Sequence, residues 1–135
     1  MESLKLFKLF VFNYLFSNGD AHLKNFSIIE TPLGDFKLSP AYDLLNSRIH
    51  IEDKDFALNE GLMPARMGQG NVAKQFQLLA HHAGIQEKQM NAILALMVSK
   101  SDQVKKRVDA SFLNERIQRN YFQAYQTRWD KLKNE

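Results

Sequence analysis

The fold of this chain is decided around residues 18–25, which read NGDAHLKN. Before this stretch, residues 4–15 place apolar side chains at three- and four-residue steps, which predicts a helix with one broad buried face that ends at Asn18-Gly19. After it, residues 26–38 read as two short strands joined by a turn at residues 31–34. The pattern therefore predicts a helix, a polar loop and a small antiparallel β-hairpin within residues 1–45.

Residues 46–70 lack hydrophobic periodicity and contain several glycines and a proline, which predicts a long loop with at most one helical turn. From Asn71 onward the chain reads as helical. We expect the Asn71 side chain to cap a helix over residues 72–83, with Gly84 at its terminating position.

Two further helical stretches complete the chain. Residues 86–109 carry an apolar pattern that is expected to break near residues 99–101, and the last helix is expected to start at Ser111 or Asn114. That helix has an apolar stripe, which we interpret as core: Ile117, Tyr121, Tyr125, Trp129 and Leu132. The predicted fold class is mainly α with one small β-hairpin, in a single domain over residues 1–135 whose residues 71–135 are the helical remainder.

The composition is that of a folded protein, with 44% hydrophobic and 24% charged residues in 135. The absence of cysteine excludes disulfides and thiolate metal sites. The net charge is only +3, so we interpret the late basic residues as a solvated helix face and do not expect direct nucleic-acid binding. These residues are Lys105, Lys106, Arg107, Arg116, Arg119, Arg128, Lys131 and Lys133.

The apolar start of the chain, residues 1–16, is interrupted by Lys5, Lys8 and Asn13, and no small-residue cleavage site follows it. A membrane span would require about 20 consecutive apolar residues, and the sequence contains no such run. We therefore expect a soluble, cytoplasmic protein.

Three polar residues carry the candidate chemistry: Asp20, Asn25 and Asp43. Each alone is an ordinary turn residue. Together they match the inventory of kinase-type phosphoryl transfer, in which one carboxylate orients the acceptor hydroxyl while an Asn and a second Asp hold magnesium. The hairpin should bring Asn25 and Asp43 close together, and both offer the oxygen ligands that Mg²⁺ prefers.

The runs NGDAHLKNFS and LSPAYDLL resemble the catalytic loop and metal-binding segment of HipA-like serine/threonine kinases, the toxin component of bacterial toxin–antitoxin pairs. The resemblance is to the C-terminal kinase lobe. It implies that Asp20 is the catalytic aspartate and that His22 is the family's histidine beside it. It also implies that Asn25 and Asp43 are metal ligands. Lys24 is a candidate phosphate contact, with a surface role as the alternative.

The resemblance further implies ATP as substrate with Mg²⁺, and a protein hydroxyl as acceptor, with an aminoacyl-tRNA synthetase as the substrate class. It implies a DNA-binding antitoxin as partner. The D-x-H-x-x-N spacing is also similar to that of aminoglycoside and choline kinases, so a small-molecule phosphotransferase lobe stays an alternative. A non-catalytic module that binds an antitoxin or another partner is the second alternative.

A kinase also needs a lobe that covers the nucleotide. No glycine precedes Gly19, so no Gly-rich phosphate loop lies upstream in these 135 residues, and Lys5 and Lys8 fall on the predicted helix. We therefore expect the chain to be a fragment of a larger kinase, or a subunit that receives its N-terminal lobe from a separate chain. Alone it should bind Mg²⁺ and ATP weakly and show little or no activity.

Overall fold

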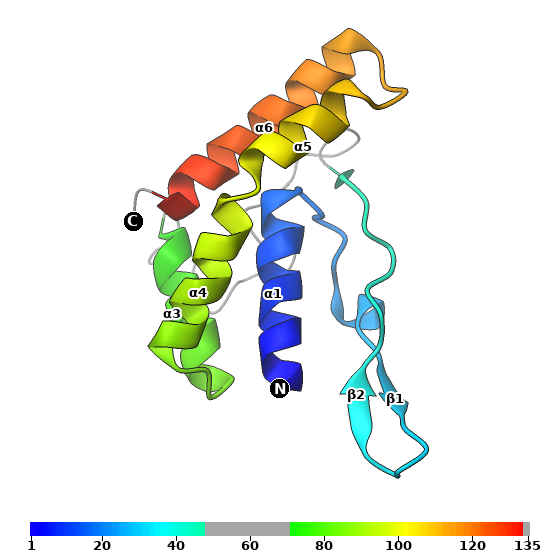
Figure 1. Ribbon diagram of the computed structural model, residues 1–135, viewed down its shortest axis with the longest axis vertical. Coiled ribbons are helices and arrows are strands. Elements are labelled where there is room, and N and C mark those ends of the chain that lie inside the picture. Colours follow the sequence, from blue (N-terminus) through cyan, green and yellow to red (C-terminus); the bar gives the residue numbers. More distant parts are fainter. Residues whose placement is uncertain (48–70, 134–135) are drawn as a thin grey trace.

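A computed structural model describes residues 1–47 and 71–133, and its elements are mainly helical (Figure 1). In chain order they are α1 (Glu2–Leu15), the short 3₁₀ helix η1 (Leu23–Asn25), β1 (Ile28–Glu30), β2 (Phe36–Leu38), α3 (Val72–His82), α4 (Glu87–Val98), α5 (Ser101–Asp109) and α6 (Glu115–Lys133). The two strands form one antiparallel sheet. The predicted fold class, mainly α with one small hairpin, is confirmed.

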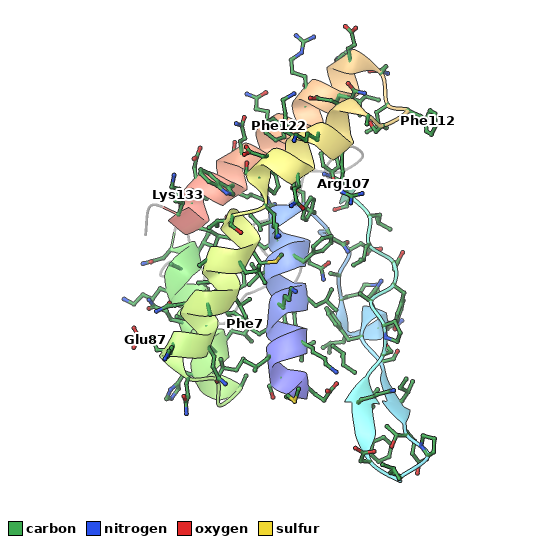
Figure 2. The ribbon with its side chains drawn as sticks, viewed as in Figure 1. Phe7, Glu87, Arg107, Phe112, Phe122 and Lys133 are labelled. Atoms are coloured by element: carbon green, nitrogen blue, oxygen red, sulfur yellow. The ribbon has the colours of Figure 1, made fainter. Side chains whose placement is uncertain are left out.

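Helix α1 lies at the centre of the molecule, between the hairpin and helices α3 and α4 (Figure 1). The core forms where its apolar stripe meets α3, α4 and α6. The Phe76 ring of α3 is fully buried and stands edge-on to Phe7 and to Tyr14, with centroids 5.8 and 5.7 Å apart. Edge-to-face packing of this kind adds to the free energy gained by burying the rings. Figure 2 shows Phe7 on α1.

The helical stretch over residues 86–109 breaks where the sequence predicts. Helix α4 ends at Val98, α5 begins at Ser101, and Ser99 donates its hydroxyl to the Leu96 carbonyl over 2.8 Å. The freed Val98 carbonyl accepts a hydrogen bond of 2.8 Å from the indole nitrogen of Trp129 on α6. Helix α6 thereby provides a donor for a carbonyl at the end of α4 that has no partner within its own helix.

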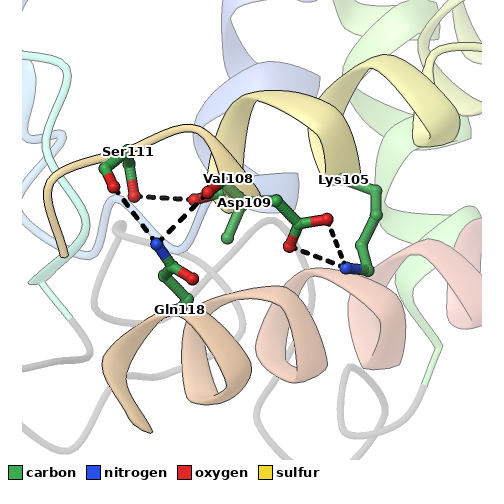
Figure 3. Close-up of polar contacts among 5 residues, drawn as sticks. All are labelled: Lys105, Val108, Asp109, Ser111 and Gln118. Atoms are coloured by element: carbon green, nitrogen blue, oxygen red, sulfur yellow. Dashed lines mark hydrogen bonds and ion pairs between the residues drawn. The ribbon is translucent and has the colours of Figure 1, made fainter. Parts of the chain in front are cut away.

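The turn between α5 and α6 is held by side chains that reach back to helix ends (Figure 3). Gln118 donates to the Ser111 carbonyl over 3.1 Å, and Ser111 donates its hydroxyl to the Val108 carbonyl over 2.7 Å. Asn114 accepts a hydrogen bond of 2.9 Å from the Ile117 backbone, which is an N-cap contact. Of the two predicted helix starts, Asn114 is confirmed.

Three expectations from the sequence need correction. Helix α1 ends at Leu15 and not at Asn18, because Ser17 has a left-handed φ of 54°. Asn71 stands at the N-cap of α3 but makes no side-chain cap bond. Arg128, expected on a solvated face, is only 3% exposed, since its guanidinium lies over the Tyr14 ring and donates to the Tyr14 carbonyl over 2.8 Å. The loop predicted over residues 46–70 lies, from residue 48 on, outside the described residues.

The hairpin pairs Ile28 with Leu38 and Glu30 with Phe36, and most of its side chains face solvent. Two contacts join it to α1: Glu2 accepts a hydrogen bond of 2.6 Å from the Leu38 backbone, and the rings of Phe10 and Phe26 stack with centroids 5.0 Å apart. These two contacts fix the position of the hairpin beside α1. None of the helices in the described part of the chain is long and apolar enough to cross a bilayer.

Candidate active site

The candidate site begins where α1 ends. Ser17 leaves the helix in the left-handed region and is buried, and Asn18 returns its backbone amide to the Asn13 carbonyl over 2.9 Å. A left-handed residue and a bond of this type are typical of a helix C-terminus that turns sharply. The next residues therefore leave the end of α1 as a tight loop.

Asp20 and His22 lie next to each other on that loop. The His22 Nε2 atom is 3.7 Å from the Asp20 Oδ1 atom, and both side chains are more than half exposed. The His22 backbone amide donates to the Asp20 carbonyl over 2.8 Å, and Asn25 donates to the His22 carbonyl over 2.9 Å. The loop is thus held by its own backbone, while the Asp20 carboxylate stays accessible to a substrate.

Asn25 and Asp43 are in direct contact. The Asn25 Nδ2 atom donates to the Asp43 Oδ2 atom, as expected from the hairpin between them. The proximity that the sequence predicts is therefore confirmed, while the roles of both residues as metal ligands stay predictions.

Tyr42, the aromatic residue directly before Asp43 in the LSPAYDLL run, holds the two ends of the hairpin together. The Tyr42 hydroxyl donates to the Lys24 carbonyl over 3.0 Å and lies 2.6 Å from the Ser27 hydroxyl. These contacts fix the backbone on either side of Asn25 and directly before Asp43. The Lys24 side chain is exposed, so its suggested role as a phosphate contact stays a prediction.

A second connection runs from the start of the loop to the segment after the hairpin. Asn18 donates its side-chain amide to the Asp43 carbonyl over 3.1 Å. Ser47 donates its backbone amide to the Ser17 carbonyl over 3.0 Å and accepts from the Gly19 amide over 2.7 Å. Sequence reasoning treated Asn18 as a turn residue and did not single out Ser47. Both side chains are buried, and no pattern in the sequence indicates that burial.

The donor set fits magnesium better than a transition metal. Within residues 1–47 and 71–133, no group of three or more His, Cys, Asp or Glu side chains comes together. Mg²⁺ needs no such cage, because it keeps several waters and binds through one or two carboxylates together with substrate phosphates. Among the described residues, the Asn25 Oδ1 atom is buried without a hydrogen-bond partner, and turning the amide over would place this oxygen beside the Asp43 carboxylate. The two residues present therefore fit a magnesium ion.

The sequence is similar to known proteins in two comparisons. The sequence model of the HipA-like C-terminal domain matches residues 2–105. A protein of Sinorhizobium fredii (strain NBRC 101917 / NGR234), named "Putative kinase Y4dM", is 51% identical over 47 residues. The matched segment covers 35% of this chain and 12% of that relative. The chain thus aligns with a small part of a much longer protein.

Proposed function

The chain belongs to the family of HipA-like C-terminal domains, and we propose that it is the catalytic-lobe portion of a serine/threonine protein kinase. In this proposal it transfers the γ-phosphoryl group of ATP to a protein hydroxyl. The observation that carries the proposal is the contact between Asn25 and Asp43, two residues that can share a cation, at the end of the loop that presents Asp20. The name of the Sinorhizobium relative supports the same class of reaction.

Asp20 is proposed to orient the acceptor hydroxyl and accept its proton. The hydroxyl oxygen then bonds to the γ-phosphorus while the bond from that phosphorus to the β–γ bridging oxygen breaks, and ADP leaves. The exposure of the Asp20 carboxylate supports this role, since a protein acceptor must reach it. His22, 3.7 Å from the carboxylate, is placed to orient Asp20 or to face the transferred phosphate.

Asn25 and Asp43 are proposed to hold Mg²⁺ through the amide oxygen and the carboxylate. A magnesium ion supplies neutralisation of the charge on the β- and γ-phosphates in this class of reaction. Lys24, exposed on the same loop, is proposed as a further phosphate contact. In this proposal Asp20 acts on the acceptor hydroxyl, and Asp43 acts on the nucleotide through the magnesium ion.

We propose the partners as well. The acceptor class is a protein of the translation machinery such as an aminoacyl-tRNA synthetase, and the regulatory partner is a DNA-binding antitoxin in a bacterial cytoplasm. A lobe that covers the nucleotide comes from elsewhere in the protein or from a separate chain.

One observation favours a second candidate function, a non-catalytic module that binds a partner protein. The hairpin exposes large apolar side chains, including Ile28, Leu33 and Phe36. Exposed apolar residues that gather on one element are typical of interaction sites. A catalytic lobe that docks a second lobe would show the same feature, so activity assays are needed to separate the two functions.

The test measures ATP-Mg binding and single-turnover phosphorylation in the protein together with any lobe it carries or binds. Asp20→Asn keeps the shape of the side chain but removes the proton acceptor, so transfer should fall by about 10²–10⁴-fold while ATP-Mg still binds. Asp43→Asn should weaken Mg²⁺-dependent nucleotide binding and transfer together. Asp109→Asn is the matched control, because Asp109 is an exposed acid paired with Lys105 on α5.

The outcomes separate the candidate functions. Unchanged transfer in both site variants would overturn the assignment of the reaction to Asp20 and Asp43. No transfer by the native protein, with its nucleotide lobe present, would overturn the kinase proposal and favour the partner-binding module. Loss of ATP-Mg binding in Asp20→Asn, with transfer from bound nucleotide intact, would mean that the roles of the two acids are reversed. The 135 residues alone should give little or no transfer.

A further inference from the structure

Asn18 is a polar side chain inside the protein, with only 5% of its surface exposed. Burying an amide is unfavourable unless its hydrogen-bonding groups find partners. The Asn18 Nδ2 atom donates to the Asn13 Oδ1 atom over 3.2 Å and to the Asp43 backbone carbonyl over 3.1 Å. Both amide hydrogens are thus used, and they join α1 to the segment that carries Asp43.

Asp43 has a backbone conformation that needs outside support. Its φ is 54°, in the left-handed region, which costs free energy for residues with a side chain, although Asp and Asn adopt it more readily than the others. The bond from Asn18 reaches the Asp43 carbonyl and not its carboxylate. It can therefore hold the backbone of Asp43 while leaving the carboxylate for Asn25 and a cation.

Ser47 makes a second connection between the same two segments. Its hydroxyl donates to the Ser17 carbonyl over 3.1 Å and accepts from the Gly19 amide over 2.7 Å, while its backbone amide also reaches Ser17. The residues on either side of Asn18 are thus tied to the chain just beyond Asp43. Asn18 is the member of this network that contacts Asp43 itself.

We infer that Asn18 is a positioning residue that sets the backbone of Asp43, and through it the position of the Asp43 carboxylate against Asn25. This inference rests on the proposed function, because it assigns the pair to a shared Mg²⁺. Asn18 does not contact the cation or the substrate. It increases the fraction of molecules whose two ligands are already in place, and apparent affinity scales with that fraction.

The role is specific to asparagine. Aspartate has the same length but no donor, so it would face the oxygens of Asn13 and Asp43 with its own oxygens. Alanine removes both bonds, and glutamine is one methylene longer in a buried site. Asn18→Ala and Asn18→Asp therefore test the bonds, and Asn71→Ala is the matched control because Asn71 makes no side-chain cap bond.

The experiment uses NMR spectra of the isotope-labelled chain, first without metal. The native chain should show a nuclear Overhauser effect between the Asn18 side-chain amide and Asp43, and a backbone coupling at Asp43 that corresponds to a left-handed φ. Asn18→Ala and Asn18→Asp should change the Asp43 signals, and Asn71→Ala should not. The absence of the Asn18–Asp43 effect in the native chain would overturn the inference, and this measurement does not depend on any variant folding.

The second readout is a titration with Mn²⁺, a paramagnetic substitute for Mg²⁺. The Asn25 side-chain amide and the Asp43 backbone amide should broaden together, and Asn18→Ala should need about tenfold more Mn²⁺ for the same broadening. Val108→Ala, a buried substitution on α5, controls for lost stability and should leave the Mn²⁺ concentration unchanged.

These measurements distinguish failure of the inference from failure of the proposed function. Equal Mn²⁺ binding by the native chain and Asn18→Ala would overturn the positioning role. A native chain that binds no Mn²⁺ at Asn25 and Asp43 would overturn the metal assignment, and with it the part of the inference that concerns the cation. If neither Asn18 variant changes the backbone signals of Asp43, the inference is overturned, whether or not the chain binds Mn²⁺.

Discussion

The molecule has two regions that are held together by different physical means. The helical body, made of α1, α3, α4 and α6, buries its apolar side chains, and Phe76 at its centre is 0% exposed. The site segment, residues 16–47, exposes most of its side chains, and Phe36 on its hairpin is 59% exposed. Backbone hydrogen bonds and a few buried polar residues hold this second region.

This difference in what holds the two regions together indicates that stability depends mainly on the helical body and function on the site segment. Burial of apolar surface is non-directional and gives most of the folding free energy, so the helical body can stand as a scaffold. Hydrogen bonds give less net stability but fix directions, which a metal or phosphate site requires. Substitutions in the first region should therefore change unfolding, and substitutions in the second should change chemistry.

The largest effect on stability should come from Phe76→Ala, which empties the centre of the helical body. Loss of a buried aromatic and the cavity left behind should reduce the free energy of unfolding by about 3–5 kcal/mol. Urea denaturation followed by circular dichroism measures it. Phe112→Ala is the control, because Phe112 projects into solvent between α5 and α6 (Figure 2). Equal losses in both variants would contradict the placement of the core.

A smaller effect should follow from Trp129→Phe, which keeps an aromatic ring but removes the indole donor. The Val98 carbonyl at the end of α4 would lose its partner, at a cost of about 1–2 kcal/mol. Trp129 is half-buried rather than fully buried, so even Trp129→Ala should cost less than Phe76→Ala. Thermal melts measure the change, with Thr127→Val as control because, in the described part of the chain, that hydroxyl bonds within its own helix. A melting temperature equal to that of the native chain would show that the bond contributes nothing.

The stability of the helical body should fall at alkaline pH. Burial raises the pKa of Tyr121 and of Tyr125 on α6, and at Tyr121 a side-chain hydrogen bond with Asn46 opposes this only in part. The folded state thus favours the neutral phenol, so stability is complete below the ordinary pKa of 10.0 and falls as the pH rises above it. Unfolding curves at pH 9 to 11 test this, and Tyr125→Phe should flatten the dependence. Constant stability over that range would contradict it.

The smallest effect should be at Glu2, which joins the two regions. The hydrogen bond from Lys5 and then that from the Leu38 amide lower the pKa of this exposed carboxylate. A lowered pKa means that the attachment is complete above the ordinary value of 4.5 and is lost as the pH falls below it. The protection factor of the Leu38 amide, which compares its exchange with the intrinsic rate at the same pH, should therefore fall in acid, and Glu2→Gln should remove this pH dependence. A protection factor that stays constant as the pH falls would show that Glu2 does not hold the strand.

Much of the fold could be predicted from the sequence because helices and hairpins leave local patterns. The break near residues 99–101, the Asn114 cap and the glycine that ends α3 all follow from residue types within a few positions of each other. The proximity of Asn25 and Asp43 was also predictable, since a hairpin returns the chain to its own start.

Other features could not be predicted, because they depend on contacts between distant segments. Arg128 reads as one more surface cation, yet the structure buries it against Tyr14, which lies on another helix. Asn18 reads as a turn residue, and only the folded chain gives its side chain a partner beyond the hairpin. A polar residue that finds its partner across the fold has no periodicity by which a sequence could reveal it.

The sequence by itself determined the helical body, the hairpin and the inventory of Asp20, Asn25 and Asp43, because apolar spacing and turn residues act over short stretches of chain. Only the tertiary structure decided which polar groups are buried and how the segments on either side of the hairpin are aligned. Burial makes an unpaired polar group costly, so the fold selects pairs for the Asn18 amide donor, the Ser47 hydroxyl and one guanidinium nitrogen of Arg128. Those pairs place the candidate site on its helical scaffold.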